Sequence, residues 1–257
     1  MIKVVKIGGN VVDNEELLSA FCAQFAALEG PKVLVHGGGV LASRLQEKMG
    51  IHARMVGGRR ITDEATLRIV TMVYAGWCSK HICALLQKEG CNAMGLSGCD
   101  GDVLRAAKRP PITIEGKEVD FGQVGDVRKE SVNAAALRKL IDAGFTPVIN
   151  AINHDGSGHL LNTNADTVAS SVAAALGAEL IICFERAGVL LDKNDDASLI
   201  ARINTEDYRR LLTEGRIDGG MLPKLENAFK VLSQGVPKVV IQHSSAPLGA
   251  SGTSICL

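Results

Sequence analysis

The chain has 257 residues, and its 28 Lys and Arg residues balance its 28 Asp and Glu residues, which gives a formal net charge of zero. This balance offers no electrostatic basis for binding nucleic acid or an anionic membrane surface, and an aromatic content of 4% leaves little surface for stacking bases. No run of about 18 apolar residues predicts a membrane-spanning helix, and the length suits one large α/β domain or two fused lobes.

The start of the chain contains two units of strand, glycine turn and helix. Residues 2–7 form a short apolar run that ends at Gly8-Gly9, and apolar residues then recur at helical spacing, with Asp13 as the expected helix cap. Residues 33–35 predict a second strand, closed by His36-Gly37-Gly38-Gly39 before another helix. Apolar strands connected by helices indicate a parallel sheet covered on both faces.

The middle of the chain is less regular. Residues 51–62 alternate between apolar and polar and predict a hairpin, whereas residues 63–89 predict one long helix that no Pro interrupts. Residues 91–127 are divided by Gly and Pro into short segments, which predicts a β-rich insertion. A helix at 131–142 and a strand at 145–150 are expected next.

Regular alternation returns in the last third of the chain. The expected elements are a helix at 166–176, a strand at 179–184, helices at 205–214 and 223–234, and a strand at 238–242. Because irregular segments precede this part and clean α/β alternation fills it, we expect a change of lobe near residues 165–180.

The N-terminal residues and the cysteines favour the cytoplasm. The first residues read directly as a strand, with no secretory signal before them. Seven cysteines without regular spacing fit a reducing compartment better than a disulfide framework. Cys78, His81 and Cys83 suggest a metal site, but Cys78 and Cys83 would lie about 140° apart around a helix. We therefore expect buried thiols and no metal held by the protein.

Two lysines stand beside features that bind anions. Glycine turns between a strand and a helix expose backbone N–H groups to anions. Lys6 lies inside an otherwise apolar strand, two residues before Gly8, where it is either a phosphate ligand or an edge-strand lysine. Lys224, beside Pro223 at a predicted helix start, is either a second phosphate ligand or a solvated helix residue.

Polar side chains at alternate positions form a third candidate site. Asn162, Asn164 and Asp166 would share one face of an extended segment and converge on one site. Alternatively, Asn164 caps a helix that contains Asp166.

A dinucleotide site is a competing interpretation. Gly37, Gly39 and Ala42 match the G-x-G-x-x-A fingerprint after a strand, but the acidic residue expected about 20 positions later is missing. Arg59 and Arg60 stand there instead and would fit NADP. The dinucleotide interpretation assigns no role to Lys6 or to Gly8-Gly9.

Seven motifs occur in an order that resembles the amino acid kinase family, over essentially the whole chain, and most closely its members that phosphorylate N-acetyl-L-glutamate. They are Lys6-Ile7-Gly8-Gly9, His36-Gly37-Gly38-Gly39, Gly58-Arg59-Arg60-Ile61-Thr62, Val124-Gly125-Asp126-Val127, Asn162-Thr163-Asn164-Ala165-Asp166, Gly220-Met221-Leu222-Pro223-Lys224 and Gly252-Thr253-Ser254-Ile255. The resemblance implies a three-layer α/β/α sandwich with a mainly parallel central sheet and hairpin insertions. It implies one domain, 1–257, with an acyl-glutamate-binding and dimerising lobe at 1–175 and an ATP-binding lobe at 176–257.

The resemblance also implies roles for single residues. Lys6 and Lys224 would stabilise charge on the transferred phosphoryl group, and Asp166 would hold both lysines. Phosphates would contact Gly8 and Gly9. The acyl-glutamate would be bound by Gly38, Gly39, Arg60 and Asn162. The nucleotide would be bound by Glu185, Gly188, Val189, Leu190, Ile217 and Asp218.

Family membership would make the protein an ATP-dependent enzyme of arginine synthesis, with Mg²⁺ held mainly by phosphate oxygens. The open alternatives are N-succinyl-L-glutamate or another small acid as substrate. Relatives often carry a Ser/Thr-Asp-Val run where Phe184-Glu185-Arg186 stands, and a Lys where Cys99 stands.

Because strand one begins at Ile2, we expect a homodimer joined through 63–89 and insensitive to arginine.

Overall fold

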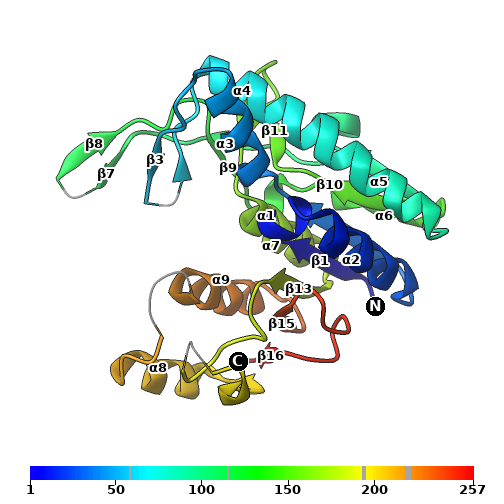
Figure 1. Cartoon of the computed structure of the whole chain (residues 1–257), viewed down its shortest axis with the longest axis vertical. Helices are drawn as coiled ribbons and strands as arrows, with labels where there is room; N and C mark the ends of the chain where they lie inside the picture. Colours follow the sequence, from blue (N-terminus) through cyan, green and yellow to red (C-terminus); the bar gives the residue numbers. More distant parts are fainter. Residues whose placement is uncertain (58, 115, 193–194, 218–220) are drawn as a thin grey trace.

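The computed structural model describes the whole chain except residues 58, 115, 193–194 and 218–220 (Figure 1). At its centre is an eight-stranded sheet in which β15 and β16 are antiparallel and the other neighbouring strands are parallel. The strand order is β14 (Arg202–Ile203), β16 (Thr253–Ile255), β15 (Val239–His243), β13 (Glu179–Phe184), β1 (Lys3–Ile7), β2 (Lys32–His36), β10 (Thr146–Ile149) and β5 (Ala93–Leu96).

Helices cover both faces of this sheet, and each face has its own hydrophobic core. One face carries α6 (Ala134–Asp142), α7 (Ala165–Leu176), α8 (Thr205–Thr213) and α9 (Met221–Ser233). The other carries α1 (Gly9–Val12), α2 (Glu15–Ala27), α3 (Gly39–Lys48), α4 (Glu64–Thr71), η1 (Met72–Cys78) and α5 (Ser79–Lys88). The expected three-layer α/β/α sandwich with a mainly parallel sheet is therefore confirmed.

The pleat of β1 decides where its lysine points. Val4 belongs to the core under α7, whereas Val5 and Ile7 belong to the core on the opposite face. Because side chains alternate along a strand, Lys6 lies on the same face as Val4, toward α7.

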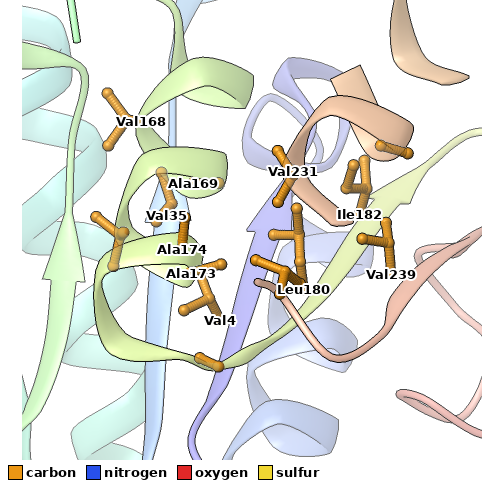
Figure 2. Close-up of a cluster of buried hydrophobic side chains, with 14 of the residues drawn as sticks. Val4, Val35, Val168, Ala169, Ala173, Ala174, Leu180, Ile182, Val231 and Val239 are labelled. Atoms are coloured by element: carbon orange, nitrogen blue, oxygen red, sulfur yellow. The ribbon is translucent and has the colours of Figure 1, made fainter. Parts of the chain in front are cut away.

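Helix α7 lies close to the sheet because its inner face is built from small residues. Figure 2 shows Ala169, Ala173 and Ala174 against the valines Val4 and Val35 of β1 and β2. Small side chains let helix and sheet pack at the density of a protein interior. The first turn of α7 is thereby held against the end of β1.

The long helix predicted at 63–89 is continuous but is not a regular α-helix, because its middle part, η1, is π-helical. The buried positions Ile69, Val73, Cys78, Ile82 and Leu86 therefore include one step of five residues, at the π-turn. By length and composition this 25-residue helix could cross a membrane, but half of its most apolar stretch is buried inside the protein. It is a core helix of the second face.

Hairpins account for most of the other short strands. The hairpin expected at 51–62 is confirmed as β3 (Met55–Val56) and β4 (Arg59–Arg60). Three further antiparallel pairs are β6 (Ala107–Lys108) with β9 (Gly125–Asp126), β7 (Ile112–Ile114) with β8 (Lys117–Val119), and β11 (Ile152–His154) with β12 (Leu160–Asn162). Short 3₁₀ turns are η2 (Asp100–Asp102), η3 (Lys129–Ser131) and η4 (Asp196–Ser198).

Two details of the sequence interpretation were wrong, and one hairpin was missed. The cap of α2 is Asn14, whose side chain accepts a hydrogen bond from the Leu17 N–H, and not Asp13. The β-rich segment at 91–127 is not wholly an insertion, because β5 is an edge strand of the central sheet. The hairpin β11–β12 was not predicted, because each strand has only three residues and no alternation can be recognised over so short a stretch.

Candidate active site

A cavity of about 460 Å³ lies where β1, β2 and β13 end side by side. The predicted site residues that line it are Lys6, Gly8, Gly9, Gly38, Gly39, Arg60 and Lys224, together with Glu185, which was predicted to bind the nucleotide. Ligands of open α/β sheets bind at the carboxyl ends of the strands, beside loops that the strands hold in place. The structure thus brings both glycine turns and both candidate lysines to one cavity.

Lys6 and Lys224 both interact with the same carboxylate. The Lys6 Nζ atom lies 2.8 Å from Asp166 Oδ1, in a pair whose side chains are 11% and 32% exposed. Burial acts to raise the pKa of the Asp166 carboxyl, but the charges of Lys6 and Lys224 together hold it below its ordinary value. Asp166 is therefore an anion that interacts with two cations, which come from β1 and α9.

Asp166 owes its position to a helix cap. Asn164 precedes α7, and its side-chain oxygen accepts hydrogen bonds from the N–H groups of Asp166 and Thr167. Such a cap stabilises a helix by about 1 kcal/mol. The capping interpretation is confirmed, and the alternative of an extended segment through Asn162, Asn164 and Asp166 was wrong, because α7 begins at Ala165.

A second cavity, of about 480 Å³, adjoins the first and shares Phe184 and Lys224 with it. Of the predicted nucleotide residues it is lined by Gly188, Val189, Leu190 and Ile217. Glu185 lines the first cavity instead, and Asp218 lies outside the described residues. Lys224 stands at the junction, with its Nζ atom 5.9 Å from the centre of the Phe184 ring.

The loop after β13 is held by the strand β16. The Val189 N–H donates a hydrogen bond to Thr253 Oγ1 at 2.8 Å. A Cβ atom on Gly188 would lie only 2.6 Å from the same oxygen, so no side chain fits there. Thr253 belongs to one of the motifs named above, but no role was predicted for it, because its contact with Val189 is not local in sequence.

Arg60 is held against α3. It is 8% exposed and donates hydrogen bonds to the Gly39 carbonyl at 2.9 Å, to Ser43 Oγ at 2.8 Å and to Gln46 Oε1. Gln46 is fully buried and donates to Thr66 Oγ1 at 3.1 Å. The sequence analysis missed Ser43 and Gln46. A glutamine four residues after Ala42, on the apolar face of a helix, was the available signal.

Asn162 is hydrogen-bonded to the segment that directly follows Arg60. Its side-chain amide donates to Thr62 Oγ1 at 3.0 Å, two residues after Arg60. Within the described part of the chain, Asn162 is not among the residues that line either cavity. Its predicted contact with the substrate stays a prediction.

The cysteine and histidine candidates do not assemble around a metal. Cys78 is buried, and His81 Nε2 lies 3.2 Å from Glu15 Oε1. Leaving aside the seven residues that are not described, the chain has no group of three His, Cys, Asp or Glu side chains that could hold a metal ion.

His36, directly before the glycine turn, is fully buried as a neutral ring. Its Nδ1 atom lies 2.8 Å from the Gly37 carbonyl oxygen, so this nitrogen carries the proton. Among the described residues Nε2 has no hydrogen-bond partner. Burial lowers the pKa of His36 to about 4, because a charged ring would place a second proton where nothing accepts it.

We expect this histidine to make folding stability depend on pH. Between pH 6.5 and 4 the unfolded chain binds a proton at His36 and the folded chain does not, so stability present above pH 6.5 is lost as the pH falls toward 4. From pH 7.5 to 5 the loss should be about 2 kcal/mol. Urea unfolding at both pH values should show it, and His36→Asn should flatten the dependence. An equal loss in the variant would assign it to other groups.

Known proteins resemble this chain along most of its length. A family model described as the amino acid kinase family matches residues 1–243. The acetylglutamate kinase of Bacteroides fragilis is 49% identical over 258 residues, covering 99% of this chain and 96% of that protein. The acetylglutamate kinase of Phocaeicola vulgatus is also 49% identical, with 99% and 98% covered. The crystal structure of smu.665 from Streptococcus mutans UA159 matches with a TM-score of 0.76 at 26% identity, covering 99% of this chain and 98% of the other.

Proposed function

Because the chain belongs to the amino acid kinase family, we propose that it transfers the terminal phosphoryl group of ATP to the side-chain carboxylate of N-acetyl-L-glutamate. The product is N-acetyl-L-glutamyl 5-phosphate, formed in the second step of arginine synthesis. Relatives that are 49% identical over nearly the whole chain carry the same activity in their names. The expected cellular location is the cytoplasm.

The Lys6–Asp166–Lys224 group, whose two lysines line the first cavity, is the observation that carries this proposal. In the reaction an oxygen of the substrate carboxylate attacks the terminal phosphorus of ATP, and the bond from that phosphorus to the bridging oxygen of ADP breaks. Such a transfer needs positioning and positive charge, and no covalent nucleophile on the protein. Lys6 from β1 and Lys224 from α9, which both interact with Asp166, supply that charge.

The residues present fit a nucleoside triphosphate. The second cavity offers apolar side chains such as Val189, Leu190 and Ile217 to a base, and Lys224 at its junction with the first cavity offers positive charge to phosphates. Gly8 and Gly9 leave the floor of the first cavity free of side chains. When bound, Mg²⁺ supplies further positive charge on the phosphate oxygens.

The other end of the first cavity suits the amino acid. Arg60 reaches it from β4, beside Gly38 and Gly39. Three of the hydrogen bonds of its guanidinium group are made to α3, so the group is held in place before substrate arrives. In this arrangement Arg60 binds a carboxylate of the acyl-glutamate, and the reacting carboxylate points toward Lys6.

A coupled assay of ADP release tests the proposal. N-acetyl-L-glutamate should support turnover that depends on both ATP and Mg²⁺, and unmodified glutamate should support little. Faster turnover with N-succinyl-L-glutamate would replace the acetyl group by succinyl within the same reaction. No turnover with any of the three acids would refute the proposal, and oxidation of NADPH by the protein would favour the dinucleotide interpretation.

We also propose that two copies of the chain associate through the long helix at 64–88. On its outer surface Trp77 is 64% exposed to solvent and Met72 is 53% exposed. Large apolar side chains are enriched at the centres of subunit interfaces. Light scattering should therefore give twice the mass of one chain. Trp77→Lys should raise the dissociation constant at least 30-fold, since buried aromatic anchors often contribute about 2 kcal/mol or more. A monomeric or ring-sized wild type would contradict this.

A further inference from the structure

Tyr74, in the π-helical part of the long helix, lies against the glycine turn of the substrate cavity. Its side chain is buried, with 6% of the residue exposed. A Cβ atom on Gly38 would lie 2.8 Å from Tyr74 Cδ1, and one on Gly39 would lie 3.7 Å from the Tyr74 hydroxyl oxygen. The tyrosine ring therefore packs directly on the backbone of Gly38, which lines the cavity.

The hydroxyl group of the same tyrosine faces Arg60. Burial raises the pKa of Tyr74, and the charge of Arg60 together with a hydrogen bond from it acts in the opposite direction. The Tyr74 hydroxyl oxygen lies beside Gly39, whose carbonyl accepts a hydrogen bond from Arg60, so it is close to the group that Gly39, Ser43 and Gln46 hold in place. A neutral phenol accepts a hydrogen bond without cancelling the guanidinium charge, which a carboxylate in this place would do.

The π-turn sets which residues of this helix point inward. In an α-helix, residue 77 would lie about 40° around the axis from the buried Val73, and residue 78 about 140° from it. The structure has the opposite arrangement, with Cys78 buried and Trp77 exposed. The extra residue in the turn makes this possible, and single π-turns inside α-helices occur frequently at functional sites.

We propose that Tyr74 is a positioning residue for the acyl-glutamate, whose ring fixes the Gly38-Gly39 turn and whose hydroxyl orients Arg60 toward the substrate carboxylate. This inference rests on the proposed function and adds a residue to its substrate end. The π-turn Met72–Cys78 is the element that places the tyrosine there while its other side presents Trp77 to solvent.

The variant Tyr74→Phe removes the hydroxyl and keeps the ring. The KM for N-acetyl-L-glutamate should rise about tenfold, as expected for the loss of one hydrogen bond to a charged group. The KM for ATP, kcat and the melting temperature should change little. Tyr74→Leu, which also removes the ring from Gly38, should raise the same KM further.

The chain provides a matched control, because Tyr208 is its other tyrosine and lies against Phe229, with the ring centres 4.8 Å apart. Tyr208→Phe should leave both KM values unchanged. If the KM for the acyl-glutamate were unchanged in Tyr74→Phe but raised in Arg60→Lys, the role of Tyr74 would be overturned and the proposed function would not.

Calorimetric titration with N-acetyl-L-glutamate, without ATP, gives a second readout that does not depend on turnover. Weaker binding by Tyr74→Phe than by Tyr208→Phe is expected. Equal binding by the two variants would overturn the role of Tyr74, and no binding by the wild type would overturn the role of Tyr74 together with the proposed function.

Discussion

Replacing Lys6 or Lys224 by alanine should lower kcat about 10²–10³-fold, with smaller changes in either KM. Both lysines line the first cavity, and both interact electrostatically with Asp166. Negative charge on the phosphoryl oxygens redistributes as one bond breaks and another forms. A fixed cation therefore stabilises the transition state more than it stabilises the bound substrates.

Two other lysines serve as controls. Lys3 lies at the opposite end of β1 and donates a hydrogen bond to the Glu29 carbonyl, and Lys230 is exposed in the last turn of α9. Lys3→Ala and Lys230→Ala remove the same charge from the same two elements and should leave kcat nearly unchanged. Near-normal kcat in both Lys6→Ala and Lys224→Ala would remove the proposed mechanism.

The second large effect is expected for Asp166→Asn, which keeps the shape of the side chain and removes its charge. We expect kcat to fall on the order of 10²-fold. Asp166 lies 2.8 Å from Lys6, and its pKa is held low by both lysines, so its loss leaves two like charges without their common anchor.

A double-mutant cycle separates this indirect role from a direct one. If Asp166 acts by positioning Lys6, then Asp166→Asn combined with Lys6→Ala should cost less than the sum of the two single changes. Strictly additive losses would show that Asp166 works independently of Lys6, for example on a metal ion bound by the phosphates.

The parallel sheet and the location of the cavity could be predicted from the sequence, because both depend on local patterns. Apolar runs followed by glycine predict strands and turns, and the carboxyl ends of neighbouring parallel strands lie at one edge. Lys6 illustrates the limit. Its spacing alone left a phosphate ligand and an edge-strand lysine equally plausible, and only the pairing of β1 between β2 and β13 shows that it is central.

Contacts between distant segments could not be predicted. Arg60 and Gln46 meet across two elements, and Thr253 reaches Val189 from β16. The π-turn was also missed, because an apolar residue stands at 77 as well as at 78, so the sequence fits a regular helix equally well.

The position of β1 has a consequence for how the chain folds. This strand, near the start of the chain, pairs with β2 on one side and on the other with β13, where Lys3 lies opposite Glu179. Folding must therefore close a very long loop before the centre of the sheet is complete, which is typical of slow folding. Until β13 has been synthesised, the backbone N–H and C=O groups along one edge of β1, which contains Val4 and Val5, have no neighbouring strand to pair with. Such an edge readily pairs with other chains. A nascent chain at this stage should depend on chaperones to avoid aggregation.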